Sequence, residues 1–407
     1  KENKELHPWS TWPSVHRGIE PEEHGIKMLN QDIGYAEKYQ TIWDDLIARD
    51  KSIGVWGSLH SYFLPKNRHV KFYFPDPFSS RYKAFPNSLR DFQKLSESIS
   101  DFFTKTKTFR LINKALLNPL IFLVKGNLSL QDLRSIIKIL INYRAPLNQT
   151  TFTFIQAELS FNRFLIQLRE TKPDVAFFFS NHLAGAMHRY WQDFFSSDTK
   201  IFNKSSVLIA MKIFDSHINK LVKLSNSFNQ DVAIALVSSM GQAPVTNNQN
   251  IDIRASIKKS DLFFENILGF KKSSLNTLSA MRPDIVIAGE KKDLDFFYNR
   301  LKHLKDKKSP IFDITYKHEK NSLTMNLSSR ESLKLFENKY LSYNGKLYKP
   351  KDLGLSLYNQ EHAQAYHIPE GVFILNNLAN GYTNKKNTRR NIKAINVKDK
   401  LINLVSK

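Results

Sequence analysis

The sequence predicts an α/β protein in which helices flank a central, mostly parallel sheet. Four apolar runs have the length of buried strands, and segments with helical spacing separate them. These runs are residues 53–56, 175–180, 232–237 and 372–375. Their apolar character is nearly continuous, which is typical of a sheet buried on both faces. A length of 407 residues indicates one large domain with insertions, or two domains.

The first half of the chain alternates between helical and strand patterns. In residues 40–48 three apolar side chains share one helical face, and residues 52–58 form a short strand that ends in a Gly-Ser loop. Helical periodicity then dominates, which predicts a helical insertion over residues 85–170. The helices expected within and after this insertion cover residues 89–103, 130–143, 152–168, 186–196 and 202–228.

The second half of the chain changes character. Lysines cluster in residues 251–355, where the runs 311–316 and 323–327 predict a hairpin, so we expect a smaller α+β subdomain there. Residues 381–407 are expected to form a basic tail. Its cations include Lys385, Lys386, Arg389, Arg390 and Lys393. The α/β core would then consist of residues 1–84, 171–250 and 356–380.

Composition restricts the classes of function. The absence of cysteine excludes disulfides, thiolate zinc ligands and a cysteine nucleophile. A net charge of +22 favours an anionic partner, although a generally Lys-rich composition also accounts for it. The chain has no Walker loop, no Gly-rich dinucleotide motif, no His-Glu-x-x-His and no aromatic-basic interleaving. We expect an anionic small-molecule or sugar-linked substrate, and nucleic acid is disfavoured as a partner.

Hydropathy bears on location. No apolar run approaches the roughly 18 residues that span a bilayer, so we expect no transmembrane segment. Residues 1–10 are polar and contain no apolar signal-peptide core. This predicts a cytoplasmic protein. The chain does not begin with Met, so the sequence does not show which residues, if any, precede Lys1.

Four stretches, in this order along the chain, are similar to the motifs of one enzyme family. They are residues 8–18 with the Pro-Glu-Glu-His-Gly-Ile at 21–26, then 173–188, then Val-Ser-Ser-Met-Gly at 237–241, and His-Ile-Pro-Glu-Gly-Val at 367–372. Together they resemble the alkaline phosphatase superfamily in its type I phosphodiesterase and nucleotide pyrophosphatase branch. The resemblance touches less than half of the chain, and it rests on the ordered set of motifs.

The resemblance implies metal-dependent chemistry with a Ser or Thr nucleophile. It places the nucleophile at Thr11, with Ser14 and Ser10 as rivals. For a Zn, Mn or Mg ion, the resemblance implies four candidate ligands, which are Asn181, His182, His188 and His367. Each residue also has a plainer explanation, because hydroxyls cap helices and histidines satisfy buried hydrogen bonds. We expect that purely structural role for His16 and His24.

The chain departs from the family at two metal positions. The superfamily begins with a strand that ends in a metal-binding Asp, which would lie upstream of Lys1. At the third motif Ser239 and Met240 stand where the family has an Asp and a His, and Met is a soft ligand unsuited to zinc or magnesium. We therefore expect a reduced site that holds a single ion at most.

Two functions follow from these observations. The first is a metal-dependent hydrolase or transferase acting on phosphate or sulfate esters, which the loop at 8–18 and His367 favour. The second is a non-catalytic protein of the same fold that binds an anionic or sugar-linked ligand, which Ser239 and Met240 favour.

Overall fold

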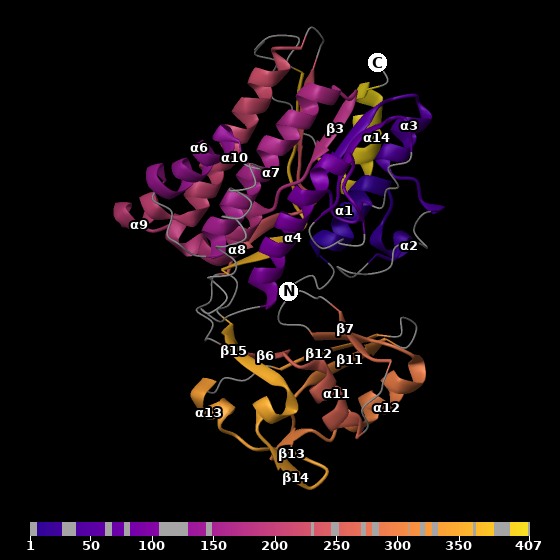
Figure 1. The fold of residues 1–407 in the computed structure, drawn as a ribbon, viewed down its shortest axis with the longest axis vertical. Coiled ribbons are helices and arrows are strands. Elements are labelled where there is room, and N and C mark those ends of the chain that lie inside the picture. Colours follow the sequence, from indigo (N-terminus) through magenta and orange to yellow (C-terminus); the bar gives the residue numbers. More distant parts are fainter. Residues whose placement is uncertain are drawn as a thin grey trace. The chain divides into compact units, whose positions relative to one another are not determined.

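The computed structural model divides the chain into two compact units (Figure 1). Unit 1 takes residues 1–27, 31–245 and 364–407, and unit 2 takes residues 246–363 with 28–30. The structure describes residues 6–26, 38–61, 67–76, 82–105, 129–143, 149–228, 232–245, 252–269, 274–278, 285–307, 309–317, 322–327, 333–360, 364–377 and 391–405. Strands β5 (Gly241–Pro244) and β16 (Ala365–Ile368) belong to unit 1 and pair with each other. In the sequence β5 comes just before unit 2 and β16 just after it, so unit 2 is an insertion into unit 1.

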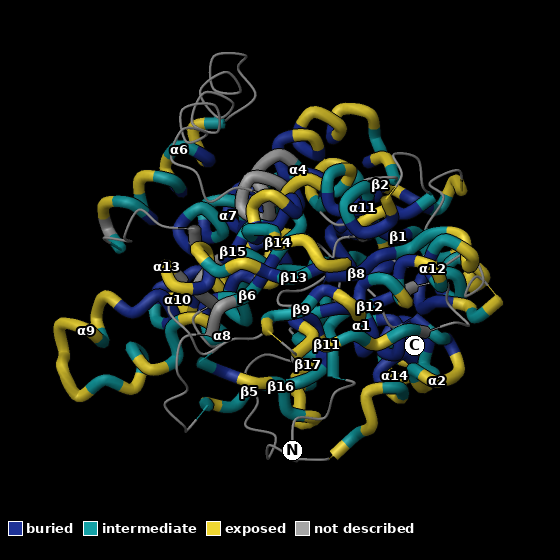
Figure 2. The backbone as a smooth tube through the Cα atoms, turned by 90° about the horizontal axis from the view of Figure 1, so that it is seen from below, coloured by how far each residue is buried: buried dark blue, intermediate teal, exposed yellow. Residues whose placement is uncertain are grey.

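A three-stranded parallel sheet of order β2-β1-β3 forms part of unit 1. Its strands are β1 (Ile53–Trp56), β2 (Val70–Phe74) and β3 (Val175–Phe178). On one face, side chains of the sheet pack against α3 (Ile42–Ala48) and α14 (Val397–Val405). On the other face they pack against α4 (Arg90–Lys105) and α7 (Gln149–Thr171). Because helices cover both faces, β1 is buried along its whole length, as can be followed in Figure 2.

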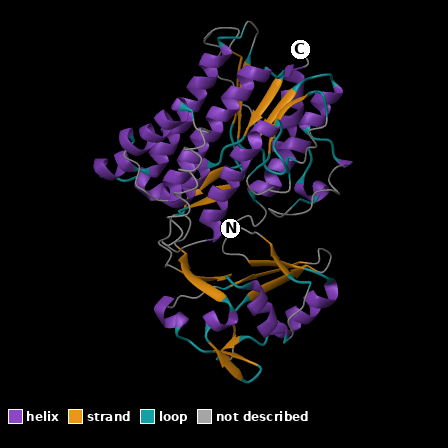
Figure 3. Ribbon diagram, in the orientation of Figure 1, coloured by secondary structure: helices purple, strands orange, loops and turns teal. Residues whose placement is uncertain are grey.

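Helices make up most of the rest of unit 1 (Figure 3). They are α1 (Pro8–Arg17), α2 (Pro21–His24), α6 (Leu130–Ile137), α8 (His182–Phe194), α9 (Thr199–Lys204) and α10 (Ser206–Ser225). The helical insertion expected over residues 85–170 contains α4, α6 and α7, and a π-helical turn at Lys138–Asn142 continues α6. Capping boxes begin α3 and α6, at Thr41 and Ser129 respectively.

The remaining strands of unit 1 correct one prediction. Strand β4 (Ala233–Val237) pairs with β17 (Phe373–Asn377), and the pairing is antiparallel, as it is between β5 and β16. The expectation that the runs 232–237 and 372–375 lie parallel is therefore wrong. Sequence periodicity shows where a strand is but carries no information on the direction of its neighbour. The mixed α/β class is confirmed, with small sheets of two to four strands.

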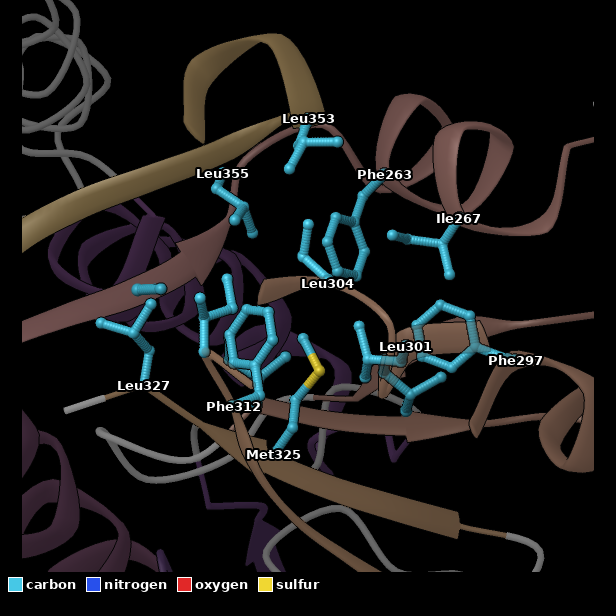
Figure 4. Packing of buried hydrophobic residues seen from close by; sticks show 14 of the residues in the cluster. Phe263, Ile267, Phe297, Leu301, Leu304, Phe312, Met325, Leu327, Leu353 and Leu355 are labelled. Atoms are coloured by element: carbon cyan, nitrogen blue, oxygen red, sulfur yellow. The ribbon is translucent and has the colours of Figure 1, made fainter. Parts of the chain in front are cut away.

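Unit 2 is an α+β unit with its own core. Its strands are β6 (Asp252–Ile257), β7 (Asn276–Leu278), β8 (Ile285–Ala288), β9 (Lys305–Asp306), β10 (Ser309–Pro310), β11 (Asp313–Lys317), β12 (Ser322–Asn326), β13 (Leu341–Tyr343), β14 (Lys346–Tyr348) and β15 (Leu355–Gln360). Its helices are α11 (Ser260–Leu268), α12 (Lys291–Leu301) and α13 (Leu333–Glu337). Strands β11 and β12 pair antiparallel, as expected for the predicted hairpin. Phe263 and Phe297 meet Leu304 and Met325 in the core (Figure 4).

Within the basic tail expected over residues 381–407, residues 397–405 form helix α14. Helix α14 packs on α1 and α3, with Val397 and Ile402 buried. Lys398 is also buried, and its Nζ lies 2.8 Å from an Asp45 carboxylate oxygen. The cations at 385, 386, 389 and 390 lie outside the described residues. Among the helices that the structure describes, none is long and apolar enough to cross a membrane.

Candidate functional site

The three candidate hydroxyls lie on α1, and all three residues are buried. Pro8 opens this helix at a position where its missing N–H costs nothing. Gly18 ends it in a left-handed conformation, with φ at 71°. The Thr11 hydroxyl donates to the carbonyl of His7 over 3.1 Å, and it is 2.8 Å from the hydroxyl of Ser239. Thr11 is therefore the hydroxyl that α1 brings to the third motif.

The Ser14 hydroxyl contacts His24, and its role in that hydrogen bond depends on which ring nitrogen of His24 carries the proton. The backbone N–H of Ile26 donates to His24 Nδ1 over 3.0 Å, so in the neutral ring the proton is on Nε2. That Nε2 lies 2.9 Å from Ser14 Oγ and donates to it. A histidine that donates to a hydroxyl cannot also remove its proton, so His24 is not a general base for Ser14. His24 bonds the backbone at a turn, as expected for a structural role.

His188 on α8 and His367 on β16 meet across 179 residues of chain, with their Nε2 atoms 3.0 Å apart. The ring planes are nearly perpendicular, at 85°. His188 Nδ1 lies 3.0 Å from the carbonyl oxygen of Ala365. A carbonyl only accepts, so this nitrogen carries the proton and Nε2 of a neutral His188 holds a lone pair.

The backbone fixes the second ring of this histidine pair in the same way. His367 has a hydrogen bond with the backbone of Leu6, and this bond favours the protonated ring. A bond has that effect when the ring N–H donates, so the acceptor is the Leu6 carbonyl. The two Nε2 atoms are thus brought together, 3.0 Å apart, with the His188 Nε2 as an acceptor.

Burial disfavours a proton between the rings. It lowers the pKa of His188, whose bond to Ala365 acts in the opposite direction and whose neighbour Arg189 lowers it further. For His367, burial and then the adjacent His188 lower the pKa to about 4, although the bond to Leu6 opposes this shift. Burial and the neighbouring positive charge thus favour the uncharged form of both rings.

Gln364 positions His188, a role that no sequence pattern indicated. Helix α8 is kinked at Tyr190, whose φ and ψ of −136° and 29° are not helical. The backbone N–H of Gln364 donates to the His188 carbonyl over 2.7 Å, and its Oε1 accepts from the Gln192 N–H over 2.9 Å. In a regular helix those two groups of α8 would bond each other. Gln364 bridges them instead, three residues before His367 on the neighbouring strand.

The other two metal candidates do not join the histidine pair. His182 donates from Nε2 to the Ala210 carbonyl over 3.2 Å, and its Nδ1 is 2.7 Å from the Ser180 hydroxyl. Both ring nitrogens of His182 are engaged within the protein, away from the histidine pair. Asn181 is the exposed N-cap residue of α8 and makes no side-chain capping bond.

Arg189 supplies an exposed cation beside the pair. Its guanidinium donates to the Gly185 carbonyl over 3.0 Å, which anchors it along α8. No carboxylate pairs with it among the described residues. A guanidinium without an acidic partner suits the oxygens of a phosphate or sulfate. The sequence offered no signal for this residue beyond its place next to His188.

A cluster of three or more His, Cys, Asp or Glu side chains suited to a metal is absent from the described part of the chain. Comparison of the chain with known protein families, with characterised proteins and with solved structures found no match. The functional interpretation therefore depends on the geometry of unit 1.

Proposed function

We propose that the protein binds phosphate or sulfate esters in unit 1 and hydrolyses or transfers them, with Thr11 as nucleophile and one divalent ion on His188 and His367. One observation carries the proposal. The His367 ring bonds the carbonyl of Leu6, and the Thr11 hydroxyl bonds the carbonyl of His7. The neighbouring residues Leu6 and His7 thus contact the histidine pair and the candidate nucleophile, respectively. The Ser239 hydroxyl also contacts the Thr11 hydroxyl.

The geometry of the pair fits a metal ion. Two nitrogens bound to one tetrahedral zinc at ~2.1 Å are about 3.4 Å apart. The observed separation of 3.0 Å would have to widen by a few tenths of an ångström, with the rings turned so that both lone pairs converge on the ion. Metal-binding histidines commonly donate their other ring N–H to a backbone carbonyl, as His188 Nδ1 does to Ala365. An ion here would supply a Lewis acid for the ester oxygens.

The residues of the chain then have separate tasks. The Thr11 hydroxyl has one proton, so when it donates to His7, the Ser239 hydroxyl donates to Thr11. This arrangement holds Thr11 Oγ in one orientation, which lowers the entropic cost of attack. Arg189 binds the anionic oxygens of the ester and neutralises charge that develops on them. Zn, Mn and Mg are the ions to test.

The test uses the full chain with an aryl phosphate, an aryl phosphodiester and an aryl sulfate, each with Zn²⁺, Mn²⁺ or Mg²⁺. We expect slow, metal-dependent turnover that falls to the uncatalysed level in Thr11→Ala, because the nucleophilic oxygen is gone. Thr11→Ser keeps that oxygen and should keep turnover. The exposed Thr199→Ala is the matched control. Full activity of Thr11→Ala would exclude Thr11 as the nucleophile.

A specific observation also favours a second function, the binding of an anionic or sugar-linked ligand without catalysis. Ser239, not a carboxylate, contacts Thr11, so no described group next to this hydroxyl can take its proton. Such a protein would turn over none of the three esters with any ion. It would still bind inorganic phosphate or sulfate after chelation, and Arg189→Ala would weaken that binding. Binding abolished by chelation would count against this second function.

A further inference from the structure

Gln242 on β5 is the direct partner of His367 in the antiparallel β5–β16 ladder. Side chains of directly opposed residues project from the same face of a sheet, with Cβ atoms about 5 Å apart. The His367 ring reaches His188 on α8, and the Gln242 amide reaches the Ala184 carbonyl of the same helix over 3.3 Å. Ala184 and His188 are one helical turn apart on one face. The Gln242 amide therefore lies on the same side of the ladder as the histidine pair.

The oxygen of this amide is orphaned. Gln242 Nε2 donates to Ala184, which sets the orientation of the amide because a carbonyl can accept only from the NH₂ group. Gln242 Oε1 is buried and has no hydrogen-bond partner among the described residues. A buried acceptor without a donor costs roughly 1–3 kcal/mol. Such an atom calls for an explanation, and a cation supplies one.

We propose that Gln242 Oε1 is the third protein ligand of the ion on His188 and His367, which makes an N₂O site for Zn²⁺ or another borderline divalent cation. This inference rests on the proposed function, from which it takes the ion on the histidine pair. Three protein ligands leave one position of a tetrahedral zinc ion open, as in catalytic zinc sites.

The composition of this site predicts its ligand. All three donors are neutral, so the loaded site keeps the full charge of the ion and attracts an anion to its open position. Arg189 adds a positive charge beside it. The site therefore selects an anionic oxygen, such as that of a phosphate or sulfate ester. Imidazole nitrogens favour Zn²⁺ over Mg²⁺, which prefers an octahedral shell of oxygens.

The test measures Zn²⁺ affinity by competition with a chromogenic chelator, so it does not depend on turnover. Gln242→Leu keeps much of the side-chain volume and removes the oxygen. We expect it to weaken Zn²⁺ binding by about 10–100-fold or more. Removing a residue that only hydrogen-bonds to a metal ligand already costs about that much affinity. Gln242→Glu loses the donor to Ala184 but restores an oxygen with a negative charge, and because this charge attracts the ion it should bind Zn²⁺ at least as tightly as the unchanged protein. Gln40→Leu, at an exposed position, is the matched control.

The outcomes separate this inference from the proposed function. If Gln242→Leu binds Zn²⁺ as tightly as the unchanged protein while His188→Ala and His367→Ala do not, Gln242 is not a ligand but the ion on the pair stands. If the unchanged protein binds no Zn²⁺, both proposals fail. Circular dichroism melting of each variant shows whether it folds. If Gln242→Leu unfolds, the Gln242→Glu result decides, and weaker binding by Gln242→Glu would overturn the inference.

Discussion

At the scale of single residues, the direction of a hydrogen bond decides what each histidine of unit 1 can do. His24 receives a backbone N–H on Nδ1, so its other nitrogen donates to Ser14. His188 gives its Nδ1 proton to a carbonyl, so its other nitrogen keeps a lone pair. The first histidine holds structure together, and the second can bind an ion. One backbone atom at each ring makes the difference.

The bridge that Gln364 makes across the kink of α8 leads to a prediction at this scale. Gln364→Leu removes the acceptor of the Gln192 N–H and frees the turn that carries His188. We expect roughly tenfold weaker Zn²⁺ binding, as for other groups that orient a metal ligand. Gln364→Glu retains an acceptor oxygen and should restore the affinity. Chelator competition measures both variants, and Zn²⁺ affinity that does not change in Gln364→Leu would show that the bridge does not position His188.

At the scale of elements, close packing determines how β1 and β2 fit together. Gly54 on β1 lies so close to Phe72 of β2 that an added Cβ would be 2.2 Å from the ring. The Phe72 side chain is fully buried, so it can move only if its neighbours in the core move too. The same sheet face packs against α4 and α7. A glycine is therefore required at this point of the parallel sheet.

Gly54→Ala should destabilise unit 1 by about 1–3 kcal/mol, the usual cost of overpacking a core. Urea unfolding followed by tryptophan fluorescence measures this, because all five tryptophans lie in unit 1. Adding Phe72→Leu to Gly54→Ala makes room and should recover part of the loss. Gly185→Ala, whose added Cβ would meet only the flexible Arg189 guanidinium, is the control. Equal stability of Gly54→Ala and the unchanged protein would contradict this packing.

At the scale of the whole molecule, each unit has a core of its own, and unit 1 also contains buried ionisable groups. Burial, and then the charge of Arg17 and the nearby His60, lower the pKa of His16 on α1 to about 3. Burial, and then His217, lower the pKa of His182 to about 3. For Glu158 on α7, burial alone would raise the pKa, but a hydrogen bond from His217 and the charge of Lys220 lower it to about 2. The folded form of unit 1 thus contains buried groups whose pKa values lie below their ordinary values.

These shifts predict that acid destabilises unit 1. His16 and His182 have a folded-state pKa below the unfolded value of about 6.5, so the unfolded chain binds more protons between about pH 6.5 and pH 3. Stability is complete above that window and falls by up to about 1.4 kcal/mol per pH unit for each histidine within it. Glu158 adds a loss between its ordinary pKa of 4.5 and about 2.

The measurement is the urea midpoint of tryptophan fluorescence at intervals from about pH 7.5 to about pH 4.5. It should fall steadily below about pH 6.5. His182→Gln should flatten the slope, since one of the buried rings that resist protonation is gone. His303→Ala removes an exposed histidine of unit 2 and should leave the slope unchanged. A midpoint independent of pH over this range would contradict the assignment.

The sequence by itself determined the local elements of this protein. Helices α4 and α7 form where helical periodicity predicted them, at residues 89–103 and 152–168. Strands β1 and β4 form at the apolar runs 53–56 and 232–237. Both patterns could be read from the sequence because they arise between neighbouring residues. The sequence also indicated His188 and His367 as candidates. Only the tertiary structure decided that these two meet while His182 turns to Ala210, that β17 is antiparallel to β4, and that α14 packs on α1. Contacts between segments far apart in the chain depend on packing of whole elements, which no local pattern encodes.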